Sequence, residues 1–128
     1  MNYRDIIVFD FETGSRNPYK TQPVQIAAVA IHGRKLTIQP EGYFESLIRP
    51  ALDDERAIEL GLDPIEDEAL AVNGKTRKEL AKAPQPKAVW KKFTNFVDKC
   101  EICFLWIKKT HTTLCRTLRI RLIFLLLL

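Results

Sequence analysis

The fold is decided by the stretch IIVFDFETG, Ile6–Gly14. Its first four residues, Ile6–Phe9, are apolar and rich in β-branched side chains, a pattern typical of a strand buried on both faces. Two carboxylates, Asp10 and Glu12, follow this run. Because alternate residues of an extended chain project to the same side, we expect both carboxylates on one face at the end of the strand.

Two carboxylates on one face of a buried strand repel each other and are costly to desolvate. A divalent cation removes that cost, and hard oxygen ligands suit Mg²⁺ or Mn²⁺. The alternative is that Asp10 and Glu12 are ordinary solvated residues where a strand ends. The context favours the metal site, because Thr13-Gly14 follows and Gly14 has no side chain to keep a ligand away from the backbone.

Outward from this stretch, the sequence predicts a three-stranded antiparallel meander followed by short helices. Gly33 is expected to supply the permissive backbone for a turn at His32–Lys35. Asp63 is expected to cap a helix that has Pro64 at its first position. Thr76 and Glu79 have the spacing of a capping box. The expected strands are Ile6–Phe9 and Val24–Ile31, with extended chain at Leu36–Gln39 and Tyr43–Ile48; the expected helices are Asp54–Leu60, Pro64–Val72, Thr76–Ala83 and Pro86–Lys99.

The character of the sequence changes at Lys99. Met1–Asp98 holds 14 Lys and Arg against 15 Asp and Glu, whereas Lys99–Leu128 holds 6 against 1. The net charge of +4 is thus the sum of −1 for Met1–Asp98 and +5 for the last 30 residues, so it gives no electrostatic footprint for nucleic acid on the preceding domain. We expect Met1–Asp98 to be the N-terminal part of one domain, and Lys99–Leu128 to be an atypical basic and apolar tail, out of frame or disordered.

Several segments resemble the DEDD (DnaQ-like) 3′–5′ exonucleases, the family of the epsilon subunit of bacterial DNA polymerase III. Val8–Gly14 is similar to the first exonuclease motif of that family, and the likeness extends over about residues 5–98. The other segments that carry it are Pro23–Ile31, Phe44–Pro50, Ala69–Thr76, Val89–Phe93 and Phe96-Val97. The resemblance implies an α/β fold of the ribonuclease H-like type, with the C-terminal part of that fold missing or replaced.

The resemblance also implies a chemistry. In that family four acidic residues hold two metal ions that clamp the scissile phosphate; one ion activates water and the other stabilises the leaving oxygen. Carried over by motif, Asp10 and Glu12 are the first two acids, catalytic and metal-binding. Phe11, Thr13 and Gly14 are the expected contacts to the terminal nucleotide.

The sequence departs from the family after the Trp90 helix. The second motif should place Asn and an aromatic residue shortly before Asp, but Asn95-Phe96-Val97-Asp98 lacks the aromatic directly before Asp98 and falls within the predicted helix. No Asp follows Asp98, and His111 has no Asp after it to act as the family's base does. We therefore expect half of the catalytic residues to be missing and activity to be impaired or absent.

The tail offers a rival interpretation. Cys100, Cys103, His111 and Cys115 have spacings that a zinc site can use, and such a site would make the chain a nucleic-acid-binding module. The segment between Cys103 and His111 is apolar and has no Gly, which favours incidental cysteines instead. The alternative function is thus a non-catalytic nucleic-acid-binding or regulatory fragment.

The remaining expectations concern partners and location. The resemblance implies the 3′ end of single-stranded DNA as substrate, RNA as a second candidate, and a polymerase as partner. The sequence shows no secretory signal, and cysteines confined to the tail favour a reducing, cytoplasmic compartment. The uncharged run Leu122–Leu128 is far shorter than the roughly 20 residues of a membrane span, so no membrane partner is expected.

Overall fold

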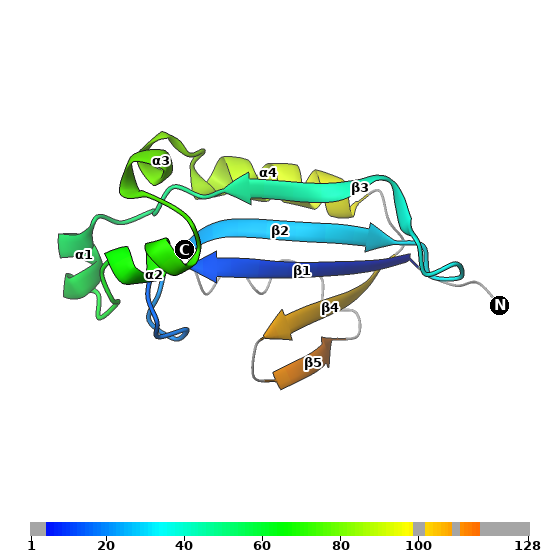
Figure 1. Cartoon of the computed structure of the whole chain (residues 1–128), viewed down its shortest axis with the longest axis horizontal. Coiled ribbons are helices and arrows are strands. Elements are labelled where there is room, and N and C mark those ends of the chain that lie inside the picture. The colour runs from blue at the N-terminus through cyan, green and yellow to red at the C-terminus, as the bar shows by residue number, and fades with distance from the viewer. Residues whose placement is uncertain (1–4, 99–101, 109–110, 116–128) are drawn as a thin grey trace. The chain divides into compact units, whose positions relative to one another are not determined.

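The computed structural model of the chain describes residues 5–98, 102–108 and 111–115, with side chains over residues 5–98 (Figure 1). The strands form a single sheet in the order β3-β2-β1-β4-β5. The first three run antiparallel in chain order, which confirms the predicted meander. The strands are β1 (Asp5–Thr13), β2 (Pro23–Ile31), β3 (Ile38–Leu47), β4 (Ile102–Lys108) and β5 (His111–Cys115).

Strand β1 is longer than the apolar run that predicted it. It begins at Asp5 and continues through Thr13, so the carboxylate motif belongs to the strand itself. Ile7 and Phe9 are buried, whereas Asp10 and Glu12 are exposed. Burial of these two side chains stabilises the strand, and pairing of its backbone keeps the polar residues that follow in an extended conformation.

The predicted turn at His32–Lys35 is present, but Gly33 does not have the role expected of it. The left-handed residue is Leu36, with φ of 53°, and not Gly33. The amide of Leu36 donates to the carbonyl of His32 at 2.8 Å, and that of His32 donates to Thr37 at 2.8 Å. A hydrogen-bonded loop closed at its ends thus imposes a backbone conformation that glycine would have adopted more easily.

Four helices follow, close to the predicted positions. The capping box is confirmed: the amide of Glu79 donates to Thr76 Oγ1 at 3.2 Å, and the amide of Thr76 donates to Glu79 Oε2 at 2.8 Å. Gly74 has φ of 64°, the left-handed conformation that commonly ends a helix. The helices are α1 (Asp54–Glu59), α2 (Asp67–Val72), α3 (Arg77–Lys82) and α4 (Pro86–Val97).

The predicted start of α2 is wrong. The helix begins at Asp67, three residues after Pro64, and Asp63 is not its cap. The Asp63 carboxylate instead accepts from Ser15 Oγ at 3.3 Å, and its amide donates to the carbonyl of Lys20 at 2.7 Å. These tertiary hydrogen bonds, and the burial of Ile65 at 6% exposure, keep the segment extended where sequence alone favours a helix.

The chain divides into two compact units. One contains the described residues up to Asp10, Ala27–Phe44 and the described residues from Phe93 onward. Its aromatic core joins β1, β3 and α4: the ring centroids of Phe9 and Phe93 lie 5.7 Å apart, and those of Phe44 and Phe93 lie 5.6 Å apart. Edge-to-face and tilted rings at this distance are a favourable aromatic arrangement.

The second unit contains Phe11–Ile26 and Glu45–Lys92, and so holds α1, α2 and α3. Its core is a cluster of buried aliphatic side chains, with the partly buried Leu47 packed against it. The cluster joins β2, the segment before α2, α2 itself and α3. Its members are Val24, Ile65, Leu70 and Leu80.

The sequence predicted no strand after Asp98, yet the structure describes β4 and β5 there. β4 pairs in parallel with β1, from Asp5 opposite Ile102 to Phe9 opposite Trp106. Apolar and β-branched composition over Ile102–Lys108 suits a strand beside the centre of a sheet. Residues 116–128 of the predicted atypical tail lie outside the described residues.

Candidate metal and nucleic-acid site

The two predicted metal ligands occupy alternate positions of β1. Asp10 and Glu12 are both exposed, with the half-buried Phe11 between them. Earlier in the same strand, Ile7 is 0% exposed and Phe9 is 7% exposed. The buried half of β1 therefore anchors the strand, and its C-terminal half presents two carboxylates to solvent.

This donor set fits a hard divalent cation in part. Mg²⁺ usually keeps several waters and is held by one or two carboxylates together with substrate phosphates, and two exposed carboxylates can supply that. Among the side chains of residues 5–98, no three His, Cys, Asp or Glu come together as a metal-binding group. The described residues thus offer ligands for one hydrated cation, and not the four carboxylates of a two-metal centre.

The backbone beyond Glu12 is fixed by hydrogen bonds from distant parts of the chain. Asn73 Nδ2 donates to the carbonyl of Thr13 at 3.2 Å. The amide of Gly14 donates to the carbonyl of Gln22 at 3.0 Å, and the Gly14 carbonyl accepts from the amide of Glu66 at 2.7 Å. The Thr13 carbonyl and both backbone polar groups of Gly14 are therefore hydrogen-bonded, which fixes the backbone at the end of the motif.

Gly14 is required by packing. A Cβ at this position would overlap Ile65 Cδ1 and would lie 3.3 Å from Val24 Cγ1. Gly14 is buried, and both of these side chains belong to the aliphatic core. This close contact accounts for the glycine; its predicted role in admitting a nucleotide remains a prediction.

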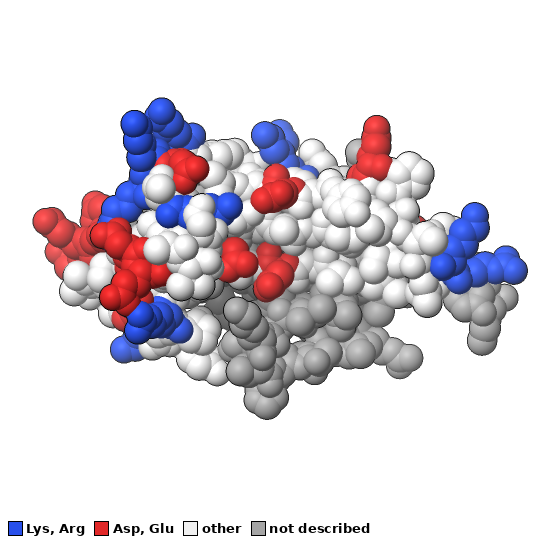
Figure 2. Space-filling model, viewed as in Figure 1, with Lys and Arg blue, Asp and Glu red and all other residues white. Residues whose placement is uncertain are grey.

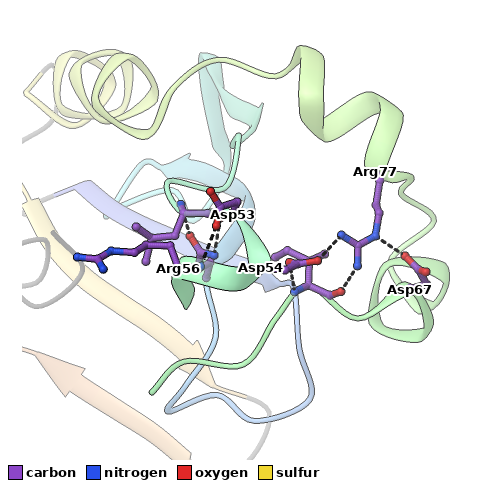
Figure 3. Close-up of polar contacts among 8 residues, drawn as sticks. Asp53, Asp54, Arg56, Asp67 and Arg77 are labelled. Carbon is purple, nitrogen blue, oxygen red and sulfur yellow. Dashed lines mark hydrogen bonds and ion pairs between the residues drawn. The ribbon is translucent and has the colours of Figure 1, made fainter. Parts of the chain in front are cut away.

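A polar cluster fixes the backbone of Ile65 (Figure 3). We call it the Arg77 cluster; its charged members are Asp54, Asp67 and Arg77. Arg77 Nη1 donates to Asp54 Oδ2 at 2.8 Å, Nε donates to Asp67 Oδ1 at 2.7 Å, and Nη2 donates to the carbonyl of Ile65. Asp54 Oδ1 accepts from the amide of Ile65 at 2.9 Å. Both backbone polar groups of Ile65 are thereby bonded within the cluster.

These contacts shift the ionisation of the charged groups. The hydrogen bond from the Ile65 amide, together with Arg77, lowers the pKa of Asp54 below its ordinary value, and partial burial opposes this shift. Hydrogen bonds to Asp67 and then to Asp54 raise the pKa of Arg77. Asp54 and Arg77 are therefore charged at neutral pH, and through Ile65 they act on the packing around Gly14.

Asn73, Ile65 and the Arg77 cluster were not predicted from the sequence to be parts of this site. Asn73 follows α2 directly, and it lies 60 residues from Thr13 in the chain. A polar residue next to a helix-ending glycine has many ordinary roles. Pairing it with the motif strand requires the fold.

The segment that superficially resembles the second motif is helical, as predicted. It falls at the end of α4, where the amide of Asp98 donates to the carbonyl of Thr94 at 2.8 Å. Phe96 of the same segment stacks at a tilt on Phe44, with ring centroids 5.6 Å apart. Its aromatic side chain thus serves the core of the first unit.

The side chains of the proposed zinc ligands lie outside the part of the chain for which the structure describes side chains. Cys100 lies outside the described residues, and for Cys103, His111 and Cys115 only the backbone is described, in β4 and β5. Cys115 is four positions after His111 in an extended strand, a separation of roughly 13 Å at about 3.3 Å per residue. One tetrahedral zinc ion with ligands at about 2.0–2.3 Å is difficult to reach from both ends of that strand.

No helix within the described part of the chain is long and apolar enough to cross a membrane.

Comparison with solved structures identifies the same architecture in several nucleases. Cell-death related nuclease 4 aligns with 81% of this chain at a TM-score of 0.63 and 17% identity. A 3′-exonuclease described as recognising the 3′ end of the histone mRNA stem-loop aligns with 83% at 0.63 and 18% identity. Exonuclease I of E. coli, in complex with an oligonucleotide, aligns with 82% at 0.61 and 17% identity.

This chain spans 35%, 36% and 21% of those three chains, respectively, so it corresponds to about a third of each or less. No curated protein matches it in sequence. The family model described as Exonuclease, of the RNase T type, matches residues 7–105, which include the carboxylate motif and four residues of β4. With its ribonuclease H-like sheet and its DEDD-type first motif, the chain belongs to the exonuclease family.

Proposed function

We propose that this chain binds one divalent cation, Mg²⁺ or Mn²⁺, through Asp10 and Glu12, and that it binds the 3′ end of a single-stranded nucleic acid beside them. The observation that carries the proposal is the exposure of both carboxylates at alternate positions of a strand whose other half is buried. The cation, when bound, supplies positive charge that attracts a phosphate and polarises it.

The chemistry of this family is 3′–5′ hydrolysis of phosphodiesters with two metal ions. Two carboxylates hold one hydrated cation weakly and cannot place a second ion at about 4 Å from the first. Little or no hydrolysis is therefore proposed for this chain. Phe11, Thr13 and Gly14 are proposed to line the path of the terminal nucleotide, because they share the strand end with the carboxylates.

The substrate class is proposed by analogy with relatives of the same fold. One was solved with a single-stranded oligonucleotide, and another is described as recognising the 3′ end of an mRNA stem-loop. DNA and RNA are both retained for this chain. A polymerase partner and a cytoplasmic location, as in epsilon-type relatives, belong to the same proposal.

Nucleotide release from a 5′-labelled single strand, with Mn²⁺ in excess, tests the catalytic part. We expect release close to that of a buffer blank, and no further decrease for Asp10→Ala. Vigorous release that Asp10→Ala abolishes would contradict the proposed impairment and would mean that other acidic residues complete the site.

The second candidate is a non-catalytic nucleic-acid-binding or regulatory role. It is favoured by the lack of a third metal-ligating group among the side chains of residues 5–98. The same preparation distinguishes the two: oligonucleotide binding that requires Mn²⁺ and is lost in Asp10→Ala supports the first candidate, whereas binding that does not depend on Mn²⁺ supports the second.

A further inference from the structure

The loop Ser15–Thr21 leaves β1 directly after the carboxylate motif and is closed at its base. The amide of Gly14 donates to the carbonyl of Gln22 at 3.0 Å, and the amide of Ser15 donates to Thr21 Oγ1 at 2.8 Å. Ser15 is 2% exposed and Gln22 is 6% exposed, so the two ends are rooted in the protein. The loop is therefore a constrained segment at its base.

The tip of the loop is also fixed by hydrogen bonds. Asn17 Oδ1 accepts from the amide of Tyr19 at 3.0 Å, and the carbonyl of Asn17 accepts from the amide of Lys20 at 3.2 Å. Side-chain caps of this kind stabilise a turn without any other element. They hold the backbone of Tyr19 while its residue surface stays 84% exposed.

A third set of contacts joins the loop to the segment before α2. The carbonyl of Lys20 accepts from the amide of Asp63 at 2.7 Å, and Arg16 forms an ion pair with Glu68 and donates its amide to Glu66 at 3.3 Å. The loop is thus anchored along its length. An aromatic ring held on such a support binds a flat partner at a small cost in conformational entropy.

The distance to the motif suits a short single strand. Tyr19 is three residues from Gln22, whose carbonyl bonds Gly14, so its Cα lies within about 11 Å of Gln22 at full extension. Adding the spacing of paired strands, about 4.8 Å, puts it within about 16 Å of Gly14. This upper limit corresponds to between about four and five stacked nucleotides at roughly 3.4 Å each.

We propose that Tyr19 is a stacking platform for a nucleobase of a single strand whose 3′ end lies beside Glu12 and Thr13. The inference rests on the proposed nucleic-acid binding and adds a subsite to it. Base stacking on an aromatic side chain tolerates any sequence, since every base has a π-face. The platform therefore recognises single-stranded character and no particular base.

The charged side chains around the loop offer few phosphate contacts. Acidic side chains gather over α1 and α2 (Figure 2), and Arg16 is paired with Glu68. Lys20 is the neighbouring exposed cation on the loop tip. With one phosphate contact from Lys20, log Kobs should fall with log salt at a slope of only about −0.7.

The test uses the full chain, a single strand of about ten nucleotides, within the range of known single-strand site sizes, and Ca²⁺ in place of a catalytic metal. A 2-aminopurine base placed about four nucleotides from the 3′ end reports stacking by its quenched fluorescence. Tyr19→Ala is expected to weaken binding about tenfold and to abolish the quench, while Tyr19→Phe retains both.

Tyr43→Ala is the matched control, because Tyr43 is 69% exposed on β3 and lies outside the loop. Equal affinity and equal quenching for Tyr19→Ala and the unmodified chain would overturn the inference while leaving the proposed function intact. Failure of the unmodified chain to bind any single strand would contradict both, and it is seen before any variant is made.

Discussion

Asn73, at the end of α2, donates a 3.2 Å hydrogen bond to the backbone carbonyl of Thr13, the last residue of β1. The bond joins two segments separated by 60 residues at the point where the carboxylate motif ends. It satisfies a carbonyl at the end of a strand, and it fixes the direction of the peptide between Thr13 and Gly14. Asn73 is therefore a positioning residue for the motif.

Asn73→Ala removes this donor and leaves the Thr13 carbonyl without it. We expect the free energy of unfolding to fall by about 1 kcal/mol, the usual net contribution of one such hydrogen bond. Urea denaturation measures the change. Asn95→Ala, at an exposed position of α4, is the control and should change the free energy by less than about 0.5 kcal/mol. Equal effects of the two substitutions would remove the role assigned to Asn73.

Gly14→Ala tests the contact between the motif and the core. The new methyl group would overlap Ile65 Cδ1, and overpacking of this kind costs about 1–3 kcal/mol. Ile65→Val deletes the overlapping atom, so the double variant should recover part of that loss. Thermal or urea unfolding of the four proteins gives the coupling energy. If the changes in unfolding free energy of the two single variants simply added, the new methyl group and Ile65 would not be in steric conflict.

Arg77→Lys tests the geometry of the Arg77 cluster. A lysine keeps the charge but cannot present a planar fork to Asp54, Asp67 and the Ile65 carbonyl together. A loss of about 1 kcal/mol in unfolding free energy is expected. The control is Arg56→Lys, because Arg56 has one exposed ion pair, with Glu59, and such pairs contribute little. A stable Arg77→Lys variant would show that charge alone suffices.

Asp54 predicts an acid-sensitive component of stability. Its pKa is lowered in the folded protein, first by the Ile65 amide. A depressed pKa contributes stability above the ordinary Asp value, and that contribution is lost as the pH falls through the folded pKa. Unfolding free energies measured from neutral pH down into the range of the Asp pKa should decline less steeply for Asp54→Asn than for the unmodified chain.

Glu55→Gln is the control for that titration, since it removes a neighbouring exposed carboxylate of α1. Its pH profile should follow that of the unmodified chain. If Asp54→Asn and Glu55→Gln gave the same profile, the hydrogen bonds to Asp54 would not be responsible for the acid sensitivity.

Much of the fold was predictable because its signals are local. The β-branched run of β1 and the spacing of Thr76 and Glu79 each depend on residues a few positions apart. The predictions for Asp63 and Leu36 were wrong because the causes are not local. Asp63 accepts a hydrogen bond from Ser15, and the conformation of Leu36 depends on closure of a loop. β4 was not predicted, because its strand-forming residues lie in a segment whose cysteines and basic residues made it look atypical.

The candidate site divides in the same way. Asp10 and Glu12 were identified from their spacing on one strand, and the structure exposes both. Asn73, Ile65 and Arg77 act on the motif through contacts of 10 to 60 residues in sequence separation, and each has a common local role that conceals the distant one. Only the three-dimensional arrangement distinguishes these roles.

The central claim is that Asp10 and Glu12 hold a divalent cation, and a titration with Mn²⁺ tests it most directly. Binding is followed by electron paramagnetic resonance of free Mn²⁺ for the unmodified chain, Asp10→Asn, Glu12→Gln and the control Glu55→Gln. We predict weak, saturable binding of one ion that both site variants abolish and the control retains. Equal binding by all four proteins, or none by the unmodified chain, would contradict the account.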